Sequence, residues 1–167
     1  QDSFAPHEFN LNLAELFPGD SVQTSFEDSL TLVDSAQYRL TVIGFDLAGN
    51  QSETIFIEPI TYDISPPIIS EVNPPNNSFV NSVDISLSIS EDLQLGSAVF
   101  FQVDGRTDSL SPHSLQFSGE MLHIGPHDSL DFSQYNLLSD SSIYDIEISG
   151  QDLAGNNAIV YKITNVT

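Results

Sequence analysis

The chain has 167 residues, of which 40% are hydrophobic, and it carries 24 acidic side chains against 3 Lys and Arg, for a formal net charge of −21. This length allows one or two domains with ordinary cores. The absence of Cys excludes disulfides and thiolate metal sites. So acidic a surface repels nucleic acid and anionic lipid, and no run of about 18 apolar residues predicts a membrane span. Neither nucleic-acid binding nor direct membrane insertion is therefore expected, and soluble cations are the natural partners.

Alternating apolar and polar residues predict strands along the chain. The alternation is clear at residues 38–43, 83–90 and 144–150, which indicates strands with one buried face. Two further strands are predicted at 99–103 and 158–164. The side chains predicted to share one core are Val83, Ile85, Leu87, Ile89, Tyr144, Ile146 and Ile148.

Turn signals separate these strands. Pro and Asn cluster at residues 65–67 and 73–77, and the first cluster predicts a domain junction between about residues 60 and 68. No segment keeps a helical period for long, and only residues 128–138 would admit a short helical turn. The chain is therefore predicted to be all-β.

The chain contains an internal repeat. Asp46-Leu47-Ala48-Gly49-Asn50 returns as Asp152-Leu153-Ala154-Gly155-Asn156, 106 positions later. Without a gap, the same shift carries Pro6-His7 onto Pro112-His113, Leu16 onto Leu122, Phe26 onto Phe132, Tyr38 onto Tyr144 and Gly44 onto Gly150. The sequence therefore predicts that residues 62–167 are one complete copy and that residues 1–61 are the C-terminal part of another.

The first copy lacks its front. A fragment of this kind would expose unpaired strand edges and half a core, so its missing strands are expected upstream in a longer protein or on another chain. The chain begins at Gln1 without an initiator Met, which agrees with an excised or mature segment.

Two local patterns favour an immunoglobulin-like β-sandwich. About 100 residues of short alternating strands are typical of that fold. Tyr38 and Tyr144 each follow an Asp-Ser pair, Asp34-Ser35 and Asp140-Ser141, as in a tyrosine corner whose hydroxyl bonds to the backbone just upstream. The Leu-Ala-Gly-Asn segments then predict tight turns with a positive φ at glycine.

At these residues the chain resembles the bacterial immunoglobulin-like repeats of large secreted cell-surface and adhesin-type proteins, whose hairpins commonly read Tyr, alternating apolar residues, then Asp-x-Ala-Gly-Asn. The resemblance implies a non-catalytic, extracellular spacer, stalk or adhesive arm, often stiffened by calcium. Its expected partners are neighbouring repeats of the same or another chain, together with surface glycans or proteins.

A calcium site is predicted at the junction between copies. In such a sandwich the start of the first strand and two loops meet at one pole, and carboxylate and amide oxygens there suit Ca²⁺. The candidate ligands are Asp63, Glu91, Asp92, Asp152, Asn156 and Asp34. Two structural alternatives stay open: Asp46 and Asp152 as turn residues that accept backbone N–H bonds, and Asp34 and Asp140 as parts of the tyrosine corners.

No catalytic motif stands out. Gly-x-Ser-x-Gly, His-Glu-x-x-His and phosphate-cradling glycine loops do not occur, and the chain lacks the Trp usual in oligosaccharide clefts. For His113, His123 and His127, packing or surface roles are expected rather than a metal site. Two alternatives to a structural repeat remain: an ancillary module of a secreted polysaccharide-degrading enzyme, and a fibre subunit completed by donated strands.

Overall fold

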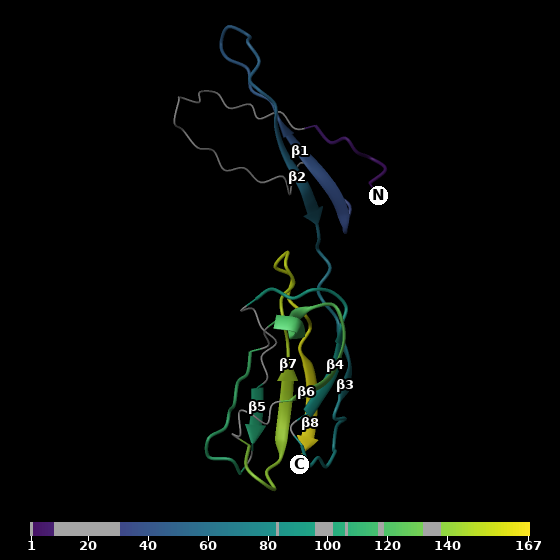
Figure 1. Ribbon diagram of the computed structural model, residues 1–167, viewed down its shortest axis with the longest axis vertical. Helices are drawn as coiled ribbons and strands as arrows, with labels where there is room; N and C mark the ends of the chain where they lie inside the picture. The colour runs from purple at the N-terminus through teal and green to yellow at the C-terminus, as the bar shows by residue number, and fades with distance from the viewer. Residues whose placement is uncertain are drawn as a thin grey trace. The chain divides into compact units, whose positions relative to one another are not determined.

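The computed structural model describes residues 2–8, 31–82, 84–95, 102–105, 107–116, 119–131 and 138–167. The chain divides into two compact units, Gln1–Ile64 and Ser65–Thr167 (Figure 1). Every strand pair between the named strands is antiparallel. Within the described residues the one helix is the 3₁₀ turn η1 (Gly119–Leu122), and no described helix is long and apolar enough to cross a membrane.

Unit 1 contains a hairpin of β1 (Ala36–Val42) and β2 (Ile55–Tyr62). The predicted strand at residues 38–43 is confirmed as part of β1, which ends one residue earlier, at Val42. Strand β2 was not predicted, because its sequence IFIEPITY is apolar at both odd and even positions and contains a proline. The register shifts by one residue between Tyr38 and Leu40, which leaves an extra residue on the β2 side.

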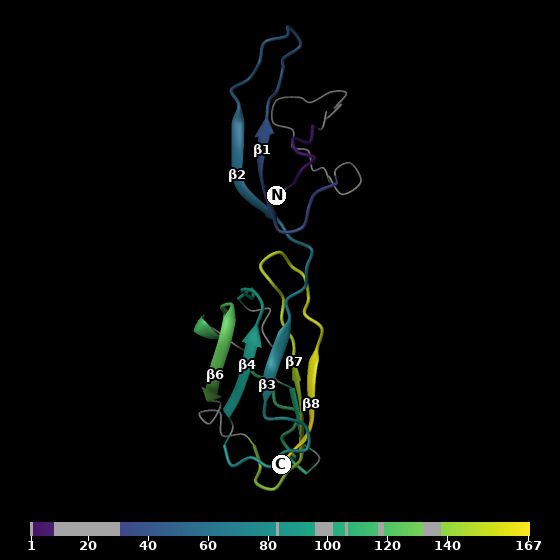
Figure 2. The ribbon, with the colours of Figure 1, turned by 90° about the vertical axis from the view of Figure 1, so that its right-hand side faces the viewer.

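The described residues of unit 2 form two three-stranded sheets. Their hydrogen-bonded orders are β3–β4–β6 and β5–β7–β8, and Figure 2 shows the first sheet as one layer with β7 and β8 on another side of the unit. The bounds are β3 Ile69–Asn73, β4 Asp84–Ile89, β5 Gln102–Gly105, β6 Gly125–Asp131, β7 Tyr144–Ile148 and β8 Tyr161–Val166.

One hydrophobic core joins the two sheets of unit 2. Along β4 and β7 the buried positions alternate with more exposed ones, as the sequence predicts. Val83 lies outside the described residues, but the other six predicted core residues are buried. The core side chains are Ile69, Ile85, Leu87, Ile89, Leu93, Leu122, Tyr144, Ile146, Ile148, Ala158, Ile163 and Val166.

One prediction is wrong at strand β6. Residues 128–131 were expected to allow a short helical turn, but they form the end of β6, and the rest of that segment lies outside the described residues or beyond the strand. The sequence GPHDSLD has no apolar alternation that would indicate a strand. It is held instead by pairing with β4, and Pro126 is tolerated because β6 is at the edge of its sheet.

The other strand bounds also differ from the sequence prediction. Strand β5 begins at Gln102, and residues 99–101 of the predicted strand lie outside the described part of the chain. Strand β8 begins at Tyr161, three residues after the predicted start, because the residues before it are where the chain comes out of a tight turn.

A short loop after β4 connects the two sheets. The Leu93 N–H donates to the Leu122 carbonyl over 2.7 Å, and the Gln94 N–H donates to the Gln151 carbonyl over 2.8 Å. Leu93 also forms an isolated β-bridge with Asp152 and is buried. These contacts fix the loop that carries Glu91 beside the turn that carries Asp152.

Candidate functional site

The Asp-Leu-Ala-Gly-Asn turn of unit 2 is built around one buried carboxylate. Asp152 is only 1% exposed. Its Oδ1 accepts N–H bonds from Ala154, Gly155 and Asn156 at 2.7–2.8 Å, and its Oδ2 accepts one from Asn156 Nδ2 at 2.8 Å. Gly155 has a φ of 99°, where a side chain would be strained. The turn role predicted for this aspartate is therefore confirmed.

The matching turn of unit 1 has the same design. Asp46 Oδ1 accepts the N–H groups of Ala48 and Asn50 at 2.9 and 2.8 Å, and its Oδ2 accepts from Asn50 Nδ2 at 2.7 Å. The Asn50 amide, helped by backbone N–H groups, holds the pKa of the Asp46 carboxyl below its usual value. Unlike Asp152, Asp46 is exposed.

Three of the predicted calcium ligands come together. One carboxylate oxygen from each of Asp63, Glu91 and Asp152 lies within 4.8 Å of the other two. Asp63 and Glu91 are partly exposed, whereas Asp152 is buried. Carboxylate oxygens at this spacing could hold a metal ion, and their hard-oxygen chemistry fits calcium better than a transition metal.

The other three candidates have bonds of their own. Asp92 Oδ1 accepts the Ile124 N–H at 2.7 Å, and Asp34 Oδ1 accepts the Ile64 N–H at 2.9 Å. Asn156 donates its side-chain N–H to Asp152, so it supports the turn. Among the described acidic residues the close group is therefore limited to Asp63, Glu91 and Asp152.

A second polar group in unit 2 links Asp108, His113 and Tyr144. The Tyr144 hydroxyl donates to Asp108 Oδ2 over 3.0 Å and accepts the Ser139 N–H over 2.6 Å. His113 Nε2 lies 2.7 Å from the same Oδ2, and Asp108 Oδ1 accepts the Leu110 N–H over 2.9 Å. The predicted bond from the tyrosine hydroxyl to upstream backbone is confirmed, but its second partner, an aspartate, was not predicted.

Unit 1 repeats this group residue for residue. The Tyr38 hydroxyl donates to Asp2 Oδ2 over 2.8 Å and accepts the Val33 N–H over 2.8 Å. His7 Nε2 lies 2.6 Å from Asp2 Oδ2. Because Asp2 and His7 are 36 and 31 positions from Tyr38 in the chain, the network holds a distant segment against the start of β1.

Asp108 and Asp2 stay ionised at neutral pH. The hydrogen bond from His113, followed by the Leu110 N–H, lowers the pKa of Asp108 from 3.8 to about 2. The hydrogen bond from His7 likewise lowers the pKa of Asp2 to about 2. Burial raises the pKa of the Tyr144 hydroxyl, which keeps its proton available to Asp108. Such groups stay in one protonation state near neutral pH and can hold neighbouring segments in place.

A longer repeated motif could have revealed the aspartates of this network. Asp-Ser-Phe-Ala-Pro-His at residues 2–7 returns as Asp-Ser-Leu-Ser-Pro-His at residues 108–113. Only its Pro-His end was used in predicting the repeat. A pair of Asp and His that recurs in both copies, in step with a repeated Tyr, is the signal that points to a shared contact.

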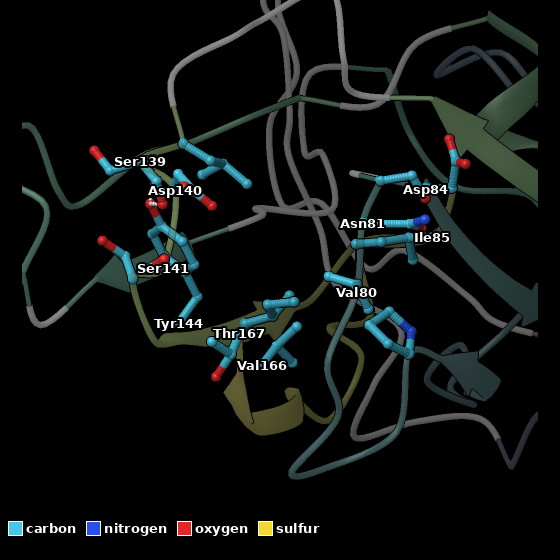
Figure 3. Close-up of a pocket in the computed structure, with 15 residues that line it drawn as sticks. Val80, Asn81, Asp84, Ile85, Ser139, Asp140, Ser141, Tyr144, Val166 and Thr167 are labelled. Carbon is cyan, nitrogen blue, oxygen red and sulfur yellow. Dashed lines mark hydrogen bonds between the residues drawn. The ribbon is translucent and has the colours of Figure 1, made fainter.

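Unit 2 also has a cavity of about 310 Å³ with a mixed apolar and polar lining. Figure 3 shows Ser139, Asp140 and Ser141 on one side of it and Asn81 and Asp84 on the other. Buried core residues of β7 line the same cavity. The carboxylates at its margin make it unsuited to anionic ligands.

The histidines do not converge. His113 belongs to the network with Asp108, and His127 Nε2 lies 2.7 Å from the His123 carbonyl oxygen. His123 Nδ1 lies 3.6 Å from Asp92, where both side chains are well exposed.

No protein-family model and no curated protein sequence matches this chain.

Proposed function

We propose that this chain is a non-catalytic segment of tandem immunoglobulin-like repeats, with a structural or adhesive role in a large secreted or surface-anchored bacterial protein. The observation that carries the proposal is the recurrence of one architecture at a spacing of 106 residues. Strand pairs Tyr38–Ile60, Leu40–Ile57 and Val42–Ile55 have the same register as Tyr144–Val166, Ile146–Ile163 and Ile148–Tyr161. Repeated modules of this kind extend a chain and present its outer domains.

The backbone geometry supports an immunoglobulin-like assignment. Two antiparallel sheets share one core in unit 2, which is the architecture of a sandwich. A tyrosine at the start of β7 bonds through its hydroxyl to the backbone five residues upstream, as in a tyrosine corner. The turn after β7 returns the chain to β8, the neighbouring strand of the same sheet.

The polar groups also favour a structural role. Asp108 and Asp152, the aspartates that are buried among the described residues of unit 2, each accept several hydrogen bonds from their own surroundings. A general acid or base instead needs a pKa close to the working pH, whereas the pKa of Asp108 is about 2. Networks of this kind hold loops in place.

Calcium is the cation that the cluster of Asp63, Glu91 and Asp152 would bind. Ca²⁺ takes six to eight oxygen ligands in flexible geometry, and three carboxylates with bound waters could supply them. Asp152 Oδ2 accepts the Asn156 side chain and has a second lone pair for a cation. A bound ion would screen the repulsion between these carboxylates and stiffen the chain around Asp63.

Thermal melting tests the calcium part of the proposal. At a hundredfold excess over its Kd, calcium should stabilise the folded chain by about 2.7 kcal/mol relative to chelator. Glu91→Gln and Asp63→Asn should each weaken this effect, while Glu120→Gln, an exposed carboxylate on η1, should not. Magnesium prefers rigid octahedral sites and should substitute poorly. Equal effects of both ions, or equal effects of all three variants, would mean only charge screening.

Stretching single molecules tests the structural role itself. The chain has no Cys, so a cysteine added at each end gives two unique attachment points. A load-bearing repeat should unfold in one cooperative step for unit 2 and regain its length after each relaxation. Gradual extension without a cooperative step would contradict the proposal. Retardation of the protein in polysaccharide-containing gels would instead favour an ancillary carbohydrate-binding module.

A further inference from the structure

The hairpin of unit 1 has one apolar face. Directly paired residues of antiparallel strands project to the same side of a sheet, so six side chains share this face. We call it the apolar face of the hairpin, and it consists of Tyr38, Leu40, Val42, Ile55, Ile57 and Ile60. The opposite face carries Arg39, which forms an ion pair with Glu58 and lies 5.8 Å from the centre of the Phe56 ring.

Four of the six side chains on the apolar face are exposed in unit 1, namely Val42, Ile55, Ile57 and Ile60, while the other two are partly buried. Five of the six counterparts in unit 2 are buried, the exception being Tyr161. Val42 is 41% exposed, whereas Ile148 at the matching position is 0% exposed. Ile57 and Ile60 are 49% and 37% exposed, and their counterparts Ile163 and Val166 are 2% and 4% exposed. The hairpins have the same register, so the difference lies in what covers them.

Unit 2 shows what that cover is. The side chains that share the core with β7 and β8 include Ile69 of β3 and Ile85, Leu87 and Ile89 of β4. Strand β5 adds to the free edge of β7, so that β7 has a neighbour on each side. A second layer with the β3–β4 pattern and an edge strand like β5 would therefore complete unit 1.

The order of segments in unit 2 shows how such a layer could be joined to unit 1. Residues 2–7 bind Tyr38 through Asp2 and His7, in the way that residues 108–113 bind Tyr144. In unit 2 the segment at 108–113 comes directly after β5, and β3 and β4 come before β5. A copy of β3, β4 and β5 placed ahead of residue 2 would thus keep the order that unit 2 has.

We infer that the apolar face of the hairpin is the docking surface for the front half of a repeat of this chain's own type, a segment with the strands that residues 65–106 supply in unit 2. This inference rests on the proposed repeat architecture and adds the occupant of one surface. A polypeptide with the alternating Ile and Leu pattern of β4 is the chemistry that fits, because six apolar side chains cannot be satisfied by a charged or polar partner.

The test is to add the covering strands to unit 1. Residues 65–106 are fused ahead of Gln1, which puts a copy of β3, β4 and β5 in step with the 106-residue repeat. Because the chain has no Cys, Val42→Cys gives a single thiol on the apolar face. Its reaction rate with a thiol reagent should be high in the 167-residue chain and more than an order of magnitude lower in the fusion. Thr41→Cys, on the opposite face, should react equally in both.

Two further variants control for folding. Ile148→Cys, fully buried in unit 2, should react slowly in both proteins and so report that unit 2 is intact. A fusion whose added copy carries Ile85→Asp and Leu87→Asp should again leave the Val42→Cys thiol reactive.

Two results would overturn the inference. The first is a Val42→Cys thiol that reacts equally fast in the fusion and in the 167-residue chain. The second is protection of the same thiol in the 167-residue chain as its concentration rises, because a second copy would then cover the face. Neither result depends on the stretching experiment, which tests the structural role separately.

Discussion

Replacing Tyr144 with Phe removes one buried hydroxyl and keeps the ring. That hydroxyl accepts the Ser139 N–H at 2.6 Å and donates to Asp108 at 3.0 Å. A neutral hydrogen bond contributes about 0.5–1.5 kcal/mol and one to a charged group about 1.5–3 kcal/mol. Asp108 keeps its bonds from His113 and Leu110, so we expect the lower part of the sum, about 2–3 kcal/mol.

Thermal or urea unfolding followed by circular dichroism measures this loss. For a unit of about 100 residues, 1 kcal/mol corresponds to a shift in Tm of roughly 4–8 °C. Tyr161→Phe is the matched control, since Tyr161 is 37% exposed, in contrast to the buried Tyr144. If both variants unfold at the same midpoint, the network does not stabilise unit 2, and the reasoning from its geometry is refuted.

Three further predictions test the charge, the core and the turn of unit 2, one of them by comparison with unit 1. The pKa of Asp108 is about 2 in the folded chain, against an ordinary value of 3.8, so its contribution to stability is complete above about pH 4 and is lost as the pH falls toward 2. Asp108→Asn should therefore flatten that part of the curve of unfolding free energy against pH, measured by urea unfolding. Ile148→Ala should cost about 2–5 kcal/mol and Val42→Ala far less, and similar losses would contradict the difference in burial. Gly155→Ala, at a φ of 99°, should cost about 1–3 kcal/mol, and an unchanged Tm would show that the turn relaxes without strain.

The strands that face the core on one side could be predicted from sequence, because burial imposes a period of two on their side chains. This is why the parity of β4 and β7 is confirmed. Strands β2 and β6 could not be predicted in this way. Strand β2 has apolar residues at both odd and even positions, so no single face stands out. Strand β6 lies at the edge of its sheet, where strand pairing and contact with solvent, rather than burial, determine which residues fit.

The candidate site could be predicted only in part, for a related reason. Asp63, Glu91 and Asp152 were proposed together from the loop order of a sandwich, and they lie close together. Nothing in the sequence separates Asp92 from Glu91, and it is the local backbone that turns Asp92 toward the Ile124 N–H. The Asp108 network was missed because its members are far apart in the chain and become visible only when two copies are compared.

Amide hydrogen exchange can test whether the two units carry copies of one structural design, because it follows one matched amide in each unit. Val33 in unit 1 and Ser139 in unit 2 each donate their N–H to a tyrosine hydroxyl. We predict that both amides exchange more slowly than their neighbours, and that Tyr38→Phe and Tyr144→Phe each remove the protection in their own unit. Fast exchange at Val33 beside slow exchange at Ser139, with no response to Tyr38→Phe, would contradict the claim.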